Sequence, residues 1–350
     1  MPVDDELEGF RQRDREIALR EANRRLQDQL VAAKNRGREL VDTVYRAAYD
    51  ASLLVDREPT PRPAPDKRKA KEEVALWHLT DWQGAKVTPS YNSDVMRERV
   101  MLFCRKAVTI TDIQRAHHPV RRCVIMFGGD MVEGLWNFPT QPLEVDSTLF
   151  GQFVGVSELI ERVVLVALAN YDEVEVVAEW GNHGRLGSKR DAIPKSDNLD
   201  RMTYELARQR LRDEKRLTWR DCPEDIQRVQ IGNYRALLMH GDEVGRTGFA
   251  SPSAWQAAGN RWKAGAYKVD GSRWDFQDVY LGHYHKVACE NLSDGVGAIY
   301  WTGSTESENR YARDSMAASG VPSQRLHFVD PEAGRLTAQY VVWLDESPAA

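Results

Sequence analysis

The stretch RRCVIMFGGDMVEG, residues 121–134, joins a short apolar run to a polar turn that carries Asp130. Apolar runs of this length that contain β-branched residues are typical of buried strands. We therefore expect Asp130 at the carboxyl end of a strand, which is where α/β sheets commonly bind their ligands.

Four other stretches from residue 74 onward repeat this arrangement of apolar run and polar turn. Helical stretches at 94–116 and 197–214 lie between some of them, so the sequence predicts a layered α/β domain. The four stretches are VALWHLTDWQGAK (74–86), EVEVVAEWGNHGR (173–185), YRALLMHGDEVG (234–245) and FQDVYLGHYHK (276–286).

The five turns carry residues that bind divalent metals, and four of the 8 histidines of the chain lie in them. Ligands of mixed oxygen and nitrogen type suit Mn, Fe, Zn or Ni better than an all-oxygen Mg or Ca site. Because the candidates outnumber the about four to six ligands of one ion, we expect two ions roughly 3.5–4 Å apart, with Asp130 bridging them. The candidates are Asp81, Gln83, Asp130, Asn182, His183, His240, His283 and His285.

Each motif alone has an ordinary interpretation. His283 and His285 could be two surface residues of a turn, and a single histidine such as His240 is more often a hydrogen-bonded core residue. The order of the motifs is more specific, because D-x-Q, G-D-x-x-E-G, G-N-H, H-G-D and G-H-x-H follow one another in the five turns. In this order they resemble the signature of the calcineurin-like metallophosphoesterases, over residues 74–345.

The resemblance implies a β-sandwich flanked by helices, with two metals at the strand ends. It implies that His183 is not a ligand but protonates the leaving oxygen or stabilises the pentavalent phosphorus, while a metal-bridging hydroxide attacks. The predicted catalytic residues are Asn182, His183 and Arg185. One metal is assigned to Asp81, Gln83, Asp130 and His285, and the other to Asp130, Asn182, His240 and His283.

Gln83 departs from the pattern of the family, which usually has histidine at this position. An amide oxygen is a weaker and harder ligand than imidazole, so we expect lower affinity at this site and a preference for Mn. Fe, Zn, Ni and Mg are the alternatives. Gln83 could instead make only outer hydrogen bonds to the ligands.

Candidate substrate contacts lie in two places. Arg185 could bind a phosphate oxygen bidentately, or it could form a surface salt bridge. In FASPSAWQAAGNRWKAGAYK, residues 249–268, aromatic residues are interleaved with cations, as in single-strand nucleic-acid tracks, and Arg261 and Trp262 are the candidates there. Trp255 and Trp262 are seven residues apart and share a helical face, which favours packing on the core instead.

These features favour a Mn-dependent phosphodiesterase, with a DNA nuclease as the favoured form. The stretch 303–330 looks like the final strands of a bacteriophage subgroup near Mre11-type nucleases. A cyclic-nucleotide phosphodiesterase or a phosphomonoesterase, including a protein phosphatase, would share the fold and the metals. A noncatalytic scaffold is the alternative of another class. Gln83 favours the scaffold, whereas His183 weighs against it because a scaffold needs no acid beside its metals.

The region before residue 74 differs in composition. Residues 1–55 predict a helical arm with a loose apolar stripe, and such an arm could form a coiled coil, a homo-oligomer contact or a docking site for another protein. Residues 56–73 contain four prolines at alternate positions followed by a basic run, which predicts an extended linker.

Composition limits the remaining functions. A net charge of -5 argues against coating nucleic acid through bulk charge, although bound cations could still attract a phosphodiester. No run approaches the roughly 18 apolar residues of a membrane span, and the start lacks the pattern of a signal peptide. We expect a cytoplasmic protein without membrane partners, in the host cytoplasm if phage-encoded.

Overall fold

The computed structural model describes residues 60–135, 137, 141–187, 195–220, 226–244, 250–269, 271–309 and 320–345, together with part of residues 20–52. The chain divides into two compact units, Met1–Ala51 and Ser52–Ala350. The described residues of the first unit are helical. The predicted arm and linker fall partly outside the described residues, so their boundaries and the coiled-coil interpretation stay predictions.

The larger sheet of the second unit has six strands in the order β13-β12-β1-β2-β3-β4. Every side chain of β1, one of its parallel strands, is buried, as expected for a continuous apolar run. The parallel strands are β1 (Val74–Leu79), β2 (Arg122–Gly128), β3 (Glu173–Glu179) and β4 (Leu217–Trp219), and β12 (Ser323–Asp330) and β13 (Arg335–Trp343) continue the sheet antiparallel.

The second sheet has five strands in the order β10-β11-β9-β6-β5, and β6, β9 and β11 run parallel. A separate hairpin joins β7 (Lys268–Val269) and β8 (Ser272–Arg273). The strands of the second sheet are β5 (Gln227–Ile231), β6 (Tyr234–Met239), β9 (Asp278–Leu281), β10 (Ala288–Asn291) and β11 (Ala298–Trp301).

Four α-helices of the second unit begin at side-chain caps, which satisfy the first backbone N–H groups of each helix. Two short helical turns, Gln141–Leu143 and Trp262–Ala266, also lie in this unit. The helices are α2 (Ser93–Arg115, capped by Asn92), α3 (Leu149–Asn170, capped by Thr148), α4 (Leu199–Arg210, capped by Asn198) and α5 (Pro252–Arg261, capped by Ser251).

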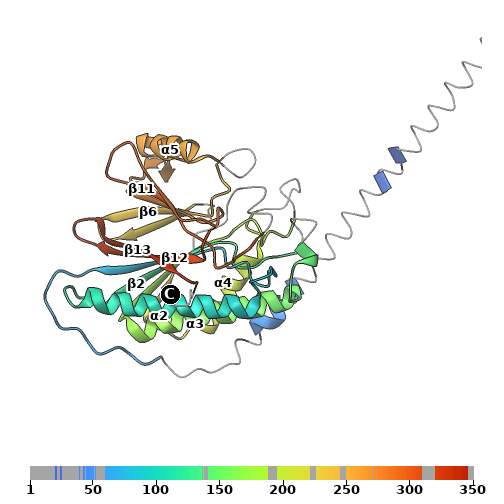
Figure 1. Ribbon diagram of the computed structural model, residues 1–350, viewed down its shortest axis with the longest axis horizontal. Coiled ribbons are helices and arrows are strands. Elements are labelled where there is room, and N and C mark those ends of the chain that lie inside the picture. The colour runs from blue at the N-terminus through green and yellow to red at the C-terminus, as the bar shows by residue number, and fades with distance from the viewer. Residues whose placement is uncertain are drawn as a thin grey trace, which may run out of the picture. The chain divides into compact units, whose positions relative to one another are not determined.

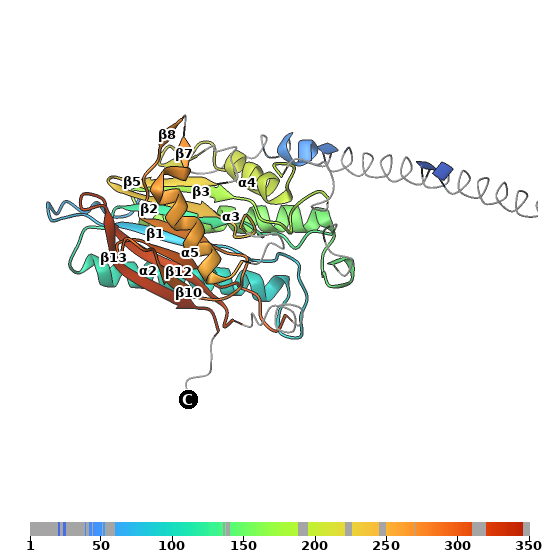
Figure 2. The same ribbon diagram turned by 90° about the horizontal axis from the view of Figure 1, so that it is seen from above.

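The second unit is built in layers, with α2 and α3 on the outer face of the six-stranded sheet and the five-stranded sheet on its inner face (Figure 1). Leu76 of the first sheet and Leu238 of the second belong to one buried core between the sheets. On the other side of the second sheet, Leu237 packs with Trp255 of α5, which lies across these strands in Figure 2. The arrangement confirms the predicted α/β β-sandwich flanked by helices.

Residues 60–73 contain no helix or strand and are held against the domain by side chains. Thr60 bonds the carboxylate of Glu214, and the guanidinium of Arg121 donates to the carbonyl oxygens of Asp66 and Arg68. This part of the predicted linker therefore contacts the domain surface. None of the described helices is long and apolar enough to cross a membrane.

Candidate metal centre

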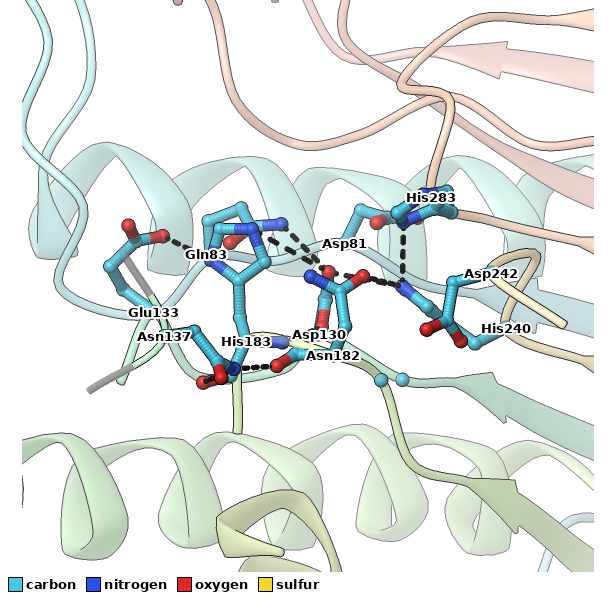
Figure 3. A network of polar contacts seen from close by, with 12 residues as sticks. Asp81, Gln83, Asp130, Glu133, Asn137, Asn182, His183, His240, Asp242 and His283 are labelled. Carbon is cyan, nitrogen blue, oxygen red and sulfur yellow. Dashed lines mark hydrogen bonds and ion pairs between the residues drawn. The ribbon is translucent and has the colours of Figure 1, made fainter. Parts of the chain in front are cut away.

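The predicted ligands converge because the strands that precede them end at the same edge of the sandwich. β1, β2 and β3 run parallel in one sheet, and β6 and β9 run parallel in the other. Figure 3 shows the side chains of both groups pointing toward a common centre. Asp81 and Gln83 follow β1, Asp130 follows β2, Asn182 and His183 follow β3, His240 follows β6, and His283 and His285 follow β9.

One half of the centre is formed around Nε2 of His240. This nitrogen lies 3.0 Å from Oδ2 of Asp130, 3.1 Å from Oδ1 of Asn182 and 3.2 Å from Nδ1 of His283. Ligand atoms of Asp130, His240 and His283 all lie within 4.8 Å of one another. These are the four residues that the sequence predicts for one metal, and the structure brings them together.

The tautomer of His240 indicates whether these four side chains could bind a cation. Its Nδ1 lies 2.8 Å from the carbonyl oxygen of Gly128, which only an N–H at Nδ1 can bond, so Nε2 of the neutral ring carries a lone pair. That lone pair faces the acceptor oxygens of Asp130 and Asn182. Acceptors that face one another require a proton or a metal cation between them, so the donor set fits a divalent metal.

The electrostatics of this half agree with that requirement. Burial disfavours a charged ring, but the Asp130 carboxylate outweighs burial and raises the pKa of His240 well above its ordinary value. Burial also opposes ionisation of Asp130, and the facing His240 and His183 nevertheless hold its pKa well below its usual range. The centre therefore strongly attracts positive charge.

The other half of the centre contains Asp81, Gln83 and His285. Nε2 of His285 lies 3.3 Å from Oδ1 of Asp81 and 3.2 Å from the side-chain nitrogen of Gln83, which is 3.4 Å from Oδ2 of Asp130. Asp130 thus contacts both halves, as a bridging ligand must. Oδ2 of Asp81 is occupied by the backbone N–H of His283 at 2.9 Å, so Oδ1 is the oxygen turned to His285.

Gln83 has a buried side-chain oxygen with no hydrogen-bond partner among the described residues. The oxygen and nitrogen of an amide are assigned from their surroundings, and a half-turn of this group would place the oxygen beside His285 and Asp130. In that orientation the oxygen could bind a metal. The side-chain oxygen without a hydrogen-bond partner is compatible with Gln83 being a metal ligand. Whether Gln83 binds a metal or only hydrogen-bonds to the ligands stays a prediction.

The backbone is strained in the same way in three of the five proposed ligand turns, those that follow β1, β2 and β9. Left-handed φ values are uncommon outside glycine and accumulate at functional sites. Of the seven described non-glycine residues with positive φ, five are predicted ligands. They are Asp81 (53°), Gln83 (47°), Asp130 (51°), His283 (65°) and His285 (51°).

Two motif glycines are explained by close approach. A Cβ on Gly181 would collide with the carboxylate of Asp130, and a Cβ on Gly282 would collide with the side chains of Thr80 and Asp81. Only glycine lets the turns after β3 and β9 pack against these carboxylates. The glycines in G-N-H and G-H-x-H are therefore required by the geometry of the centre.

His183 is held beside the centre by groups on both sides. Its Nδ1 lies 3.0 Å from Oε2 of Glu133, whose other oxygen lies 3.1 Å from Nζ of Lys86. Its Nε2 lies 3.9 Å from Oδ2 of Asp130. Burial opposes a charged ring, but the carboxylates of Glu133 and Asp130 outweigh it and raise the pKa of His183 to about 9. The ring is thus held as a proton donor whose Nε2 faces the centre (Figure 3).

Two carboxylates beside the centre were not assigned from the sequence. Glu133 lies in the G-D-x-x-E-G motif, so its fixed spacing from Asp130 is a signal that could have identified it. Glu306 follows β11 and lies 3.1 Å from Nδ1 of His285, which turns Nε2 of that ring toward Asp81. No sequence pattern marks Glu306, because only the pairing of β9 with β11 brings it to His285.

The predicted substrate residues are placed differently from one another. Arg185 does form a salt bridge, a 2.7 Å ion pair with Asp242, but at 8% exposure it lies in the interior and not on the surface. Trp262 packs against Trp255, with ring centroids 6.2 Å apart, which agrees with the packing interpretation. Arg261 is exposed at the end of α5. The polar contacts described above for the ligand cluster involve neither Arg261 nor Trp262.

No family model matches the sequence, and no curated protein matches it. Among solved structures, the chain is similar to zinc-bound Vps29 of Entamoeba histolytica (12% identity, TM-score 0.35, covering 77% of this chain and 99% of that chain). The sulfate thiohydrolase SoxB of Thermus thermophilus has 10% identity and a TM-score of 0.36, covering 80% and 58%. The phosphopantetheinyl hydrolase of Mycobacterium tuberculosis has 12% identity and a TM-score of 0.30, covering 67% and 92%.

Proposed function

We propose that the protein is a metal-dependent phosphoesterase of the calcineurin-like type that uses two divalent cations. The observation that carries the proposal is the acceptor cluster around Nε2 of His240, beside which His183 is held by Glu133. A carboxylate, Asp130, contacts both halves of the cluster. Divalent cations bound there would bring positive charge to a phosphoryl group and lower the pKa of bound water.

The residues of the chain would divide the work around these cations. Asn182, His240 and His283 with Asp130 would hold one metal, and Asp81, Gln83 and His285 with Asp130 the other. His183 would donate a proton from Nε2 to the leaving oxygen, because Glu133 occupies its Nδ1. Arg185 would contact a substrate phosphate by exchanging part of its pairing with Asp242.

Manganese is the proposed metal, because an amide ligand at Gln83 is harder than the imidazole that it replaces. The favoured substrate is a phosphodiester, with DNA as the favoured form, and a phage-type nuclease is the proposed class. A cyclic-nucleotide phosphodiesterase or a phosphomonoesterase would use the same groups, so the choice depends on substrate tests.

A noncatalytic scaffold is the second candidate, favoured by the amide at Gln83. The arrangement of His183 opposes it. A partly buried ring that pairs with Glu133, and through it with Lys86, places a protonatable nitrogen beside the ligand cluster, which proton transfer needs and a scaffold does not.

The test compares hydrolysis of bis-p-nitrophenyl phosphate and p-nitrophenyl phosphate in Mn²⁺ and in EDTA. We expect diester hydrolysis that requires Mn²⁺ and that falls by about 10²–10⁴-fold in His183→Ala, the usual contribution of a general acid. His117→Ala, which removes an exposed histidine at the end of α2, is the matched control and should keep full activity.

The other outcomes select the alternatives. If the monoester is hydrolysed faster than the diester, the protein would be a phosphomonoesterase and the diesterase proposal would be wrong. If the folded protein binds Mn²⁺ but hydrolyses neither substrate, the result would favour the scaffold. Labelled DNA, RNA and a cyclic nucleotide then separate the diesterase forms, and hydrolysis of the cyclic nucleotide alone would overturn the nuclease proposal.

A further inference from the structure

Asp200 lies in the first turn of α4, and its side chain is completely buried. Its carboxylate accepts hydrogen bonds from four backbone N–H groups, which uses the about four acceptor positions that a carboxylate offers. Oδ2 accepts from Asp130 and Gly181, both at 2.8 Å, and Oδ1 accepts from Met131 at 3.0 Å and Val132 at 3.2 Å.

These four amides belong to two different turns of the metal centre. Asp130, Met131 and Val132 follow β2, whereas Gly181 follows β3 and directly precedes Asn182. A single oxygen of Asp200 therefore joins the backbone of one proposed ligand to the residue next to another. The separation between the Asp130 carboxylate and the Asn182 amide depends on this junction.

Asn198, the residue that caps α4, strengthens the same junction. Its Oδ1 accepts from the N–H of Asp200 at 2.8 Å, and its Nδ2 donates to the carbonyl oxygen of Gly181 at 2.7 Å. A Cβ on Gly184 would collide with this Oδ1, so glycine at 184 lets the start of α4 close on the turn after β3. The start of α4 thus holds both the N–H and the carbonyl of Gly181.

A carboxylate suits this position for two reasons. Hydrogen bonds from N–H groups to an ionised carboxylate are stronger than those to a neutral acceptor. The N-terminal end of a helix also favours negative charge. A neutral side chain would leave buried N–H groups of both turns without an adequate acceptor, and such groups are costly in a protein interior.

We infer that Asp200 is a positioning residue of the metal centre. It contacts no metal or substrate itself but fixes the two turns that carry Asp130 and Asn182. This inference rests on the proposed function for the presence of metals, and it assigns Asp200 no chemical step.

The test is Mn²⁺ binding by isothermal titration calorimetry on the full chain, comparing wild type with Asp200→Asn. Asparagine has the same shape, but its NH₂ group would face backbone N–H donors. We expect at least tenfold weaker Mn²⁺ binding, within the roughly 10–100-fold range of groups that support metal ligands. Asp213→Asn, which removes an 82% exposed carboxylate after α4, is the matched control and should bind as wild type does.

Amide hydrogen exchange in EDTA gives a second readout that needs no metal. We expect the N–H groups of Asp130, Met131, Val132 and Gly181 to exchange at least tenfold faster in Asp200→Asn, while those of β6 keep their protection. Unchanged Mn²⁺ affinity in a folded Asp200→Asn protein would overturn the inference, even if the protein were less stable. Unchanged exchange at all four amides would also overturn it.

Should Asp200→Asn not fold, Asn198→Ser takes its place. Serine can still cap α4 through its hydroxyl oxygen but lacks the side-chain NH₂ group that donates to the Gly181 carbonyl. Mn²⁺ binding at least threefold weaker supports the inference, and unchanged binding overturns it. Tight Mn²⁺ binding by a wild-type protein that hydrolyses nothing would refute the proposed function alone, whereas absence of Mn²⁺ binding in wild type would refute both.

Discussion

The metal-ligand turns and the segment 249–268 both carry residues that could bind phosphate esters, but their surroundings differ. In the turns, side chains from the ends of β1, β2, β3, β6 and β9 point at one another. In the segment, the side chain of Trp255 is buried in the apolar core beneath α5, and that of Trp262 packs against it.

The cause of the difference is topology. Parallel strands end at one edge, so polar residues placed after each of them meet whatever their separation in sequence. A helix places residues seven apart on one face, and that face packs against whatever lies beside it. Residue types alone therefore say less about function than the structural position at which they occur.

Asp130→Ala is the variant with the largest expected effect, because Asp130 contacts both halves of the centre. Removal of a group that only supports a ligand costs about 10–100-fold in metal affinity, so loss of a bridging ligand should cost more than about 100-fold. Metal content after dialysis and Mn²⁺ titration would measure it. Asp275→Ala, which removes a carboxylate with 64% of its side chain exposed beyond α5, is the control. Two tightly bound metals in Asp130→Ala would contradict the proposed centre.

Trp262→Ala should affect stability and leave the chemistry unchanged. Trp262 is half-buried against Trp255, so we expect a loss of about 2 kcal/mol in the free energy of unfolding, less than for a fully buried tryptophan. Arg261→Ala, one residue earlier and exposed, should change stability by less than about 0.5 kcal/mol. Urea unfolding measures both, and DNA binding by either variant tenfold weaker than wild type would restore the nucleic-acid interpretation of this segment.

The sequence predicts the strand ends of the centre because each apolar run followed by a polar turn is a local pattern. Asp81, Asp130 and His240 could be placed at strand ends in this way, and the structure brings them together. The fold class followed from the same pattern and from the resemblance.

The remaining features depend on contacts between distant segments. Glu306 reaches His285 only because β11 pairs with β9, and Asp200 reaches Gly181 only because α4 closes on the turn after β3. Burial of Arg185 requires Asp242 from the other sheet. Positive φ values at the ligands are likewise imposed by the packing of the turns and are not encoded by their residue types.

Asp278 is a buried carboxylate outside the metal centre and can be compared with the buried carboxylates of the centre. Asp278 begins β9, the strand whose other end leads to His283, and it is 4% exposed. Its oxygens accept from the hydroxyl of Tyr234 and the backbone N–H of Ala298, both at 2.8 Å. Burial raises the pKa of Asp278 to about 6, although these hydrogen bonds and Lys263 oppose the shift. Its partners satisfy it within the core, so it offers no sign of a metal site.

Asp278→Asn should therefore change how stability depends on pH. An aspartate in the unfolded chain titrates near pH 3.9, so between about pH 4 and 6 the folded protein binds more protons than the unfolded chain, and stability falls as pH rises. Asparagine does not titrate, so the effect is seen in the difference between the free energies of unfolding of wild type and variant. This difference should fall by on the order of 2 kcal/mol from about pH 4 to 6 and stay level above about pH 6. Urea unfolding in EDTA from pH 4 to 8 measures the difference, in which the titration of the metal ligands cancels. Asp213→Asn should give a profile parallel to wild type, and a parallel profile for Asp278→Asn as well would show that Asp278 titrates alike in both states.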